Sequence, residues 1–160
     1  MATSSELTLS VRLFLKAYRW RKIAPTPWAT LQKPLAQCKL ALGSSAGFVL
    51  PSQEPFDDHY KGGDPSCRWI PTETSTSNLI ETHRSKSFDH EGLQRDPNLG
   101  LPLNRMRTLK ENGFIGSLNH RHVSFMGSIT APGKFTAKTA PAFAQSFVED
   151  DVDIALLVPV

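Results

Sequence analysis

The sequence predicts an α/β domain with an open, mostly parallel sheet of the Rossmann-like or flavodoxin-like kind. Three observations lead to this class. Predicted strands and helices alternate along residues 37–160. The last predicted strand, Val152–Val158, is apolar on both faces, as is typical of the middle of a covered parallel sheet. The chain has 160 residues, of which 39% are apolar, and this suits one domain with a real core.

Residues 1–36 are predicted to form a basic helical arm and a proline-rich linker. Apolar residues at i, i+3, i+4 and i+7 predict an amphipathic helix over residues 11–21: Val11, Phe14, Leu15 and Tyr18. Pro25, Pro27 and Pro34 then exclude regular structure. Residues 1–40 hold seven Lys or Arg and only one acid, Glu6, so they carry +6 while the whole chain carries +3.

The α/β domain, residues 37–160, begins with a short apolar strand, Lys39–Leu42. It runs into a turn of small residues, Ser44–Gly47, which leaves backbone N–H groups accessible. Residues 51–100 are rich in Pro, Gly, Asp and Ser, so they are predicted to be mostly loop, with one short strand at Cys67–Ile70. An irregular insertion of this length in a compact domain is usually functional.

Two helices and two strands are predicted after the loops. Pro102–Asn112 has Pro in its first turn, one apolar face and Gly113 as a left-handed cap, and a strand at Phe114–Leu118 follows. Thr139 is the predicted N-cap of a second helix. Its apolar face is predicted to consist of Ala140, Phe143, Ala144, Phe147 and Val148. The strand Val152–Val158 completes the sheet.

Composition limits the partners of this chain. Basic residues in the domain are not interleaved with stacking aromatics, so no nucleic-acid partner is expected, and the basic helix is better suited to an acidic partner. No stretch approaches the ~20 apolar residues that cross a bilayer, and the N-terminus lacks the charge order of a signal peptide. A cytoplasmic location is therefore expected, with an organellar transit peptide as the alternative reading of the basic N-terminus.

No metal site is predicted. Cys38 and Cys67 have no partner at zinc-ligand spacing, and His120 with His122 would give two ligands without a third. His83, Asp89 and His90 are interpreted as loop-fixing hydrogen-bonding residues. A Ser45, His122 and Asp89 triad lacks the GxSxG elbow, and no GxGxxG or GxxxxGK[ST] motif indicates a nucleotide.

The candidate site lies where the strands end. Ligands of open α/β sheets bind outside the carboxyl ends of the strands, so the segments that follow these ends are expected to converge on one edge of the sheet. The predicted substrate-binding residues are Ser44, Ser45, Gly47, Ser124, Phe125, Met126, Gly127, Pro159 and Val160.

Seven segments, in order along the chain, resemble a known family. They are Trp28–Pro34 (WATLQKP), Lys39–Gly47 (KLALGSSAG), Gly63–Pro71 (GDPSCRWIP), Thr82–His90 (THRSKSFDH), Pro102–Leu109 (PLNRMRTL), Gly116–Gly127 (GSLNHRHVSFMG) and Asp150–Val160 (DDVDIALLVPV). Together they resemble selenoprotein B of the glycine, sarcosine, betaine and D-proline reductases, from about residue 18 to residue 160.

The resemblance implies a redox function. In that family the segment like Asp153–Val160 is followed by selenocysteine or cysteine, then Pro, any residue and Cys. This sequence holds neither partner, so it is expected to be truncated at that position and inactive as it stands, with a UGA codon after Val160 in the gene. Family members cleave a carbon–nitrogen bond reductively. The nucleophile is a selenol or thiol, which acts in its ionised form.

The resemblance also implies partners. These are a small amino acid or related substrate, companion reductase subunits and a thiol reductant. Association into a homo-oligomer is expected for a different reason, because an uncovered apolar face on the last strand (Ile154, Leu156 and Leu157) would favour it. No cofactor is expected in this chain, whereas a companion subunit would carry a pyruvoyl group. The alternative is a non-catalytic α/β ligand-binding or adaptor domain that uses the same strand ends.

Overall fold

The computed structural model describes residues 8–18, 24–25, 27, 29–85 and 89–160. The chain divides into two units, residues 1–30 and residues 31–160. The first unit contains α1, Leu9–Ala17, which has no buried residue. The helix expected over residues 11–21 is present but ends earlier than predicted, because Tyr18 is extended; residues 19–21 lie outside the described residues.

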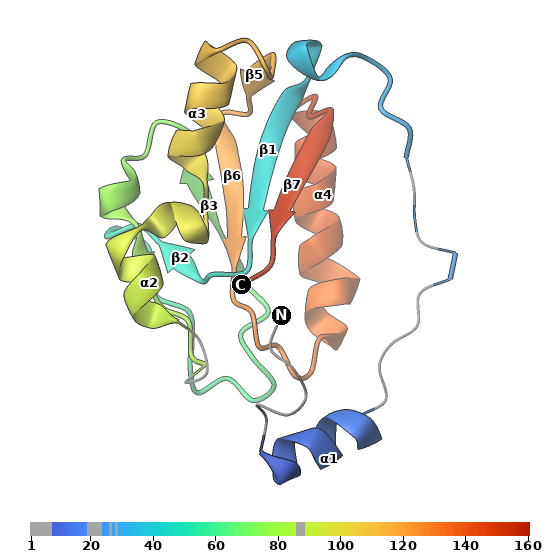
Figure 1. Ribbon diagram of the computed structural model, residues 1–160, viewed down its shortest axis with the longest axis vertical. Coiled ribbons are helices and arrows are strands. Elements are labelled where there is room, and N and C mark those ends of the chain that lie inside the picture. Colours follow the sequence, from blue (N-terminus) through green and yellow to red (C-terminus); the bar gives the residue numbers. More distant parts are fainter. Residues whose placement is uncertain (1–7, 19–23, 26, 28, 86–88) are drawn as a thin grey trace. The chain divides into compact units, whose positions relative to one another are not determined.

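The second unit is built on a five-stranded sheet with β1, Lys39–Ser44, at its centre (Figure 1). Along one flank, β1 pairs in parallel with β5, Ser117–Leu118, and β6, Arg121–Phe125. Along the other flank it pairs in parallel with β7, Ile154–Val158. The fifth strand, β3 (Cys67–Pro71), lies antiparallel on β6. The predicted α/β class with a mostly parallel sheet is therefore confirmed.

Helices cover both faces of this sheet (Figure 1). One face packs on α4, Ala140–Glu149, where Ala41, Val123 and Phe147 form a buried cluster. The other face packs on α2, His90–Arg95, and α3, Leu103–Glu111, around the larger core. Phe48, Leu42, Ile70, Leu101 and Leu103 of that core are fully buried.

The position of β7 differs from the prediction. Its run of apolar residues indicated the middle of the sheet, but within the described part of the chain β7 pairs with β1 alone and forms an edge. Leu157 is 60% exposed and Leu156 is 39% exposed, whereas Leu42 of β1 is fully buried. An apolar run shows that a strand can be covered on both faces, but it does not say which strand has two neighbours.

The two helices predicted for the domain agree with the structure to different degrees. α3 begins and ends close to the prediction, and Gly113 has the expected left-handed conformation at φ 74°. Thr139, however, is not an N-cap, because it has helical dihedral angles and ends a π-helical turn, Phe135–Thr139. Its hydroxyl instead donates to the Pro65 carbonyl at 2.6 Å. Val148 is also 68% exposed rather than on the buried face.

The loop-rich segment contains more structure than expected. β2, Phe48–Val49, pairs antiparallel with β4, Ile80–Glu81, in a small second sheet. The short helix α2 was not predicted. The described residues of the domain also form three single-turn 3-10 helices: Leu35–Gln37, Thr76–Asn78 and Pro97–Leu99. No helix within the described residues is long and apolar enough to span a membrane.

Candidate functional site at the strand ends

Ser45 connects the carboxyl ends of three strands. Its backbone N–H donates to the Val158 carbonyl at 3.2 Å, and its own carbonyl accepts from the Gly127 N–H at 2.8 Å. The Ser45 hydroxyl accepts from the Val160 N–H at 2.9 Å and donates to the Val160 carbonyl at 3.3 Å. We call this region, which comprises Ser45, Phe125, Gly127 and residues 157–160, the strand-end site.

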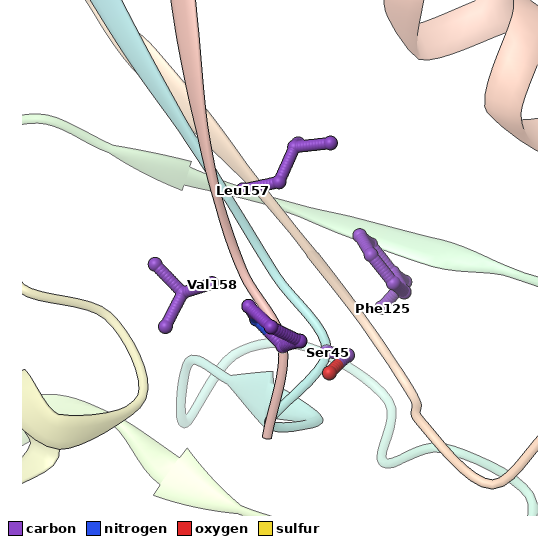
Figure 2. Close-up of a pocket in the computed structure, with 5 residues that line it drawn as sticks. Ser45, Phe125, Leu157 and Val158 are labelled. Atoms are coloured by element: carbon purple, nitrogen blue, oxygen red, sulfur yellow. The ribbon is translucent and has the colours of Figure 1, made fainter. Parts of the chain in front are cut away.

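A cavity of about 310 Å³ opens at the strand-end site (Figure 2). Its lining is apolar apart from one hydroxyl and consists of Ser45, Phe125, Leu157, Val158 and Pro159. The Phe125 ring is held from α4, because it stacks on Phe143 with ring centroids 6.0 Å apart and an interplanar angle of 8°. The cavity therefore has one rigid aromatic wall and suits the apolar part of a small ligand.

The predicted site residues fall into two groups. Ser45, Phe125 and Pro159 line the cavity, and Gly127 and Val160 adjoin it through Ser45. The remaining four do not line it: Ser44, Gly47, Ser124 and Met126. The binding role of all nine stays a prediction.

The four residues outside the cavity are explained by strand alternation and turn geometry. The buried Ser44 hydroxyl accepts from the Ala46 N–H at 3.1 Å, and Met126 packs in a small core with Val49 and Phe56. The Ser124 hydroxyl is buried with no hydrogen-bond partner within the described residues. Gly47 is part of the turn, with φ 69°, and its N–H donates to the Phe125 carbonyl at 3.0 Å.

His83 reaches the strand-end site from the loop after β4, which sequence reasoning missed. It is 6% exposed, and burial lowers the pKa of its imidazole. A Cβ atom added at Gly127 would lie 2.8 Å from His83 Nε2, 3.1 Å from the Ser45 carbonyl oxygen and 3.4 Å from that of Val160. The imidazole is thus beside the point where β7 ends. The only sequence signal was the cluster His83, Asp89 and His90.

Glu81 and His90 hold the loop that carries His83. The Glu81 carboxylate accepts from the His83 backbone N–H and from His90 Nδ1, the latter at 2.7 Å. His90 Nε2 contacts the Ser85 carbonyl at 2.9 Å. Since both acceptors are oxygens, both ring nitrogens of His90 donate, and the hydrogen bond to Glu81 raises the pKa of His90. The loop is therefore fixed by an ion pair, in agreement with the loop-fixing interpretation.

His120 and His122 do not form a pair of ligands. His120 lies just before β6 with a side chain that is 69% exposed, whereas His122 is fully buried. His122 Nδ1 accepts from the Leu42 N–H at 3.0 Å, so Nε2 carries the proton and donates to Thr72 Oγ1 at 3.1 Å. Burial lowers the pKa of His122 to about 4. Within the described residues no three potential metal ligands lie together.

Neither cysteine lines the cavity. Cys38 is buried at the opposite end of β1, where its thiol contacts the Pro34 carbonyl at 3.4 Å. Cys67 begins β3, where the strand Cys67–Ile70 was predicted, and is paired in register with Phe125. Burial raises the pKa of the Cys67 thiol, which keeps it protonated and a poor nucleophile at neutral pH.

Comparison with known proteins supports one family. Residues 11–159 match the model of the family described as glycine/sarcosine/betaine reductase selenoprotein B. D-proline reductase subunit gamma of Acetoanaerobium sticklandii is 32% identical over 136 residues, which are 84% of this chain and 54% of that protein. Sarcosine reductase complex component B subunit beta of Peptoclostridium acidaminophilum is 27% identical over 139 residues, 85% of this chain and 30% of that protein.

The chain thus spans about half the length of the first relative and under a third of the second. No solved structure matches the chain. Because the family model covers nearly all of the sequence, the expected resemblance is confirmed, and the chain belongs to the glycine/sarcosine/betaine reductase selenoprotein B family.

Proposed function

We propose that this chain forms the substrate-reducing, selenol- or thiol-bearing part of an amino-acid reductase complex, with its substrate bound at the strand-end site. The observation that carries the proposal is the double hydrogen bond between Ser45 and Val160. It fixes the end of β7 beside the cavity, and this is where the resemblance puts the redox residue. In the functional protein that residue, selenocysteine or cysteine, would follow Val160, and residues 1–160 alone would be inactive.

The proposed reaction is reductive cleavage of a carbon–nitrogen bond in a small amino acid or related compound. The selenolate or thiolate attacks the carbon, and the nitrogen leaves with the bonding electron pair and takes up a proton. A dithiol reductant then supplies two electrons and ends as a disulfide, while the carbon gains a hydrogen. Within this chain, the cavity would bind the apolar part of the substrate and exclude water.

Companion subunits are supported by the names of the two relatives, which are subunits of reductase complexes. We propose that one companion carries a pyruvoyl group, which would activate the substrate amine, and that this chain carries no cofactor itself. A cytoplasmic location and a homo-oligomer remain part of the proposal.

A second function, a ligand-binding or adaptor domain without catalysis, is favoured because neither Cys38 nor Cys67 is among the residues that line the cavity. One assay separates the two functions. The native complex should release amine from its substrate only when a dithiol is present, and alkylation should abolish this. A binding domain would hold the ligand equally well with and without dithiol, and no amine would be released.

A further inference from the structure

The Gly127 side of the strand-end site presents two nitrogen groups, and the nearby Glu81 carboxylate accepts from the backbone N–H of His83. His83 Nε2 lies against Gly127, and the carbonyl oxygens of Ser45 and Val160 lie against the same glycine. Arg84 follows in sequence, and its guanidinium donates to the Tyr60 carbonyl at 3.0 Å and to the Ser128 carbonyl at 3.4 Å. Ser128 is the residue after Gly127, so a positive charge is fixed beside the same loop.

The hydrogen-bonding partner of the other ring nitrogen determines which atom of His83 carries the proton. The backbone N–H of Ser85 donates to His83 Nδ1 at 3.2 Å, so Nδ1 is an acceptor. A neutral imidazole with an acceptor at Nδ1 carries its proton on Nε2. Nε2 is the nitrogen next to Gly127, so the side chain offers an N–H donor on the Gly127 side of the strand-end site.

The charged groups around His83 shift the pKa of its imidazole in opposite directions, and burial is the main reason that the ring is neutral. Desolvation is the largest cause of the lowered pKa of His83, and His90 and Arg84 lower it further, while Glu81 raises it. His83 is thus a neutral donor near neutral pH rather than a competing cation. A neutral donor stabilises an anion without having to release a proton of its own.

We propose that His83, assisted by the charge of Arg84, is the residue that stabilises the anionic sulfur or selenium at the strand-end site. The proposal rests on the proposed function, because it assigns the donor for the reactive anion of that reaction. Donation to the ionised form lowers the pKa of a thiol and so increases the reactive fraction at neutral pH. Gly127 is required for this arrangement, because a side chain there would occupy the space beside Nε2.

The test places a thiol at the end of β7 in the chain as it exists. In Val160→Cys, the pH dependence of iodoacetamide labelling, followed by peptide mass spectrometry, gives the pKa of the introduced thiol separately from Cys38 and Cys67. We expect a pKa about one unit below the usual ~8.5 of a free cysteine. Adding His83→Phe should restore the usual pKa and slow labelling at pH 7 about tenfold.

Two further variants distinguish a hydrogen-bonding role of His83 from a purely structural one. His83→Gln carries an amide N–H that can take the place of Nε2–H, and it should keep the pKa of the thiol introduced by Val160→Cys low. His59→Phe removes an imidazole whose side chain is 94% exposed and should change nothing. Circular dichroism identifies any variant that fails to fold. If a variant does not fold, the ¹⁵N chemical shifts of the His83 ring are measured in the unsubstituted chain instead of the thiol pKa. We expect the shifts of a neutral imidazole with its proton on Nε2.

An unshifted thiol pKa in Val160→Cys, or equal pKa values with and without His83→Phe, would overturn the proposal, as would an Nδ1–H tautomer. This titration needs neither substrate nor companion subunits. Failure of the reductase function would instead appear as absence of dithiol-dependent amine release while the thiol pKa remains low. The two failures are therefore distinguishable.

Discussion

The two buried histidines make the stability of the fold sensitive to acid. The pKa of His122 is lowered from 6.5 to about 4, and the pKa of His83 is lowered as well. The unfolded chain therefore binds more protons than the folded chain between these values. The stability that the neutral rings contribute is fully present above pH 6.5 and is lost as the pH falls toward 4.

For His122 alone the loss over this range is on the order of 3 kcal/mol, since one pKa unit corresponds to about 1.4 kcal/mol. Urea unfolding at several pH values measures it, and His122→Asn, which retains an acceptor for the Leu42 N–H, should show a flatter profile. His90 acts in the opposite sense, because its pKa is raised: the stability that it contributes is fully present below pH 6.5 and is lost as the pH rises through the raised pKa. An equal slope in the wild type and in His122→Asn would contradict this prediction.

Gly127 should tolerate no side chain, whereas Gly133 should. A Cβ at Gly127 would lie 2.8 Å from His83 Nε2 and 3.1 Å from the Ser45 carbonyl, while a Cβ at Gly133 meets nothing within 4 Å. Gly127→Ala is expected to lower the free energy of unfolding by about 1–3 kcal/mol. Gly133→Ala should change it by less than about 0.5 kcal/mol. Thermal and urea unfolding of the two variants check this, and similar stabilities would refute the described packing around Gly127.

Removal of the Ser45 hydroxyl should loosen the end of β7. Ser45→Ala breaks both side-chain hydrogen bonds to Val160, so we expect a loss of about 1 kcal/mol in unfolding free energy and faster hydrogen exchange at the Val160 amide. Ser52→Ala, at an exposed turn position, is the matched control. Unchanged exchange at Val160 in Ser45→Ala would show that the hydroxyl does not hold the strand end.

At this scale the sequence predicted the strand-end residues but not the residue that faces them. Ser45 and Phe125 could be found because residues that follow parallel strands share one edge of a sheet. The split between Ser45, which lines the cavity, and Ser44, which is buried away from it, depends on strand register. His83 approaches from a distant loop, and neither periodicity nor a motif spacing predicts such a contact.

At the scale of elements, two adjacent residues of α4 differ in burial. Phe147 is 6% exposed and contacts Trp69 with ring centroids 5.7 Å apart, whereas Val148 is 68% exposed. Phe147→Ala should therefore cost about 3–5 kcal/mol of unfolding free energy. Val148→Ala should stay within about 0.5 kcal/mol. Denaturant unfolding of both measures the difference, and comparable losses would mean that the helix faces the sheet differently.

Helical periodicity predicted the existence of α3 and α4 but not their details. The apolar spacing of Phe143 and Phe147 predicts which face of α4 is buried. It does not predict whether the next apolar residue, Val148, belongs to that face. Thr139 has the composition of an N-cap, yet the π-helical turn before it extends the helix, and the Thr139 hydroxyl bonds to Pro65 instead. The apolar pattern of β7 wrongly indicates the centre of the sheet, because such a pattern reports burial potential rather than neighbours.

For the whole molecule, the fold class followed from alternating elements, while the proposed redox function rests on family resemblance alone. An α/β sheet hosts many activities, and the strand-end site includes neither Cys38 nor Cys67. The chain spans about half the length of D-proline reductase subunit gamma. The chain contributes the strand ends, the cavity and the His83 donor.

Alkylation mapping of the native complex during turnover tests the central claim most directly. Iodoacetamide should abolish dithiol-dependent amine release, and substrate should protect one residue in the peptide that contains Val160, mapped by mass spectrometry. We predict that the extent of labelling at Cys38 and Cys67 does not correlate with the loss of activity. Loss of activity that follows labelling of Cys38 or Cys67, with no reactive residue in the Val160 peptide, would contradict the claim.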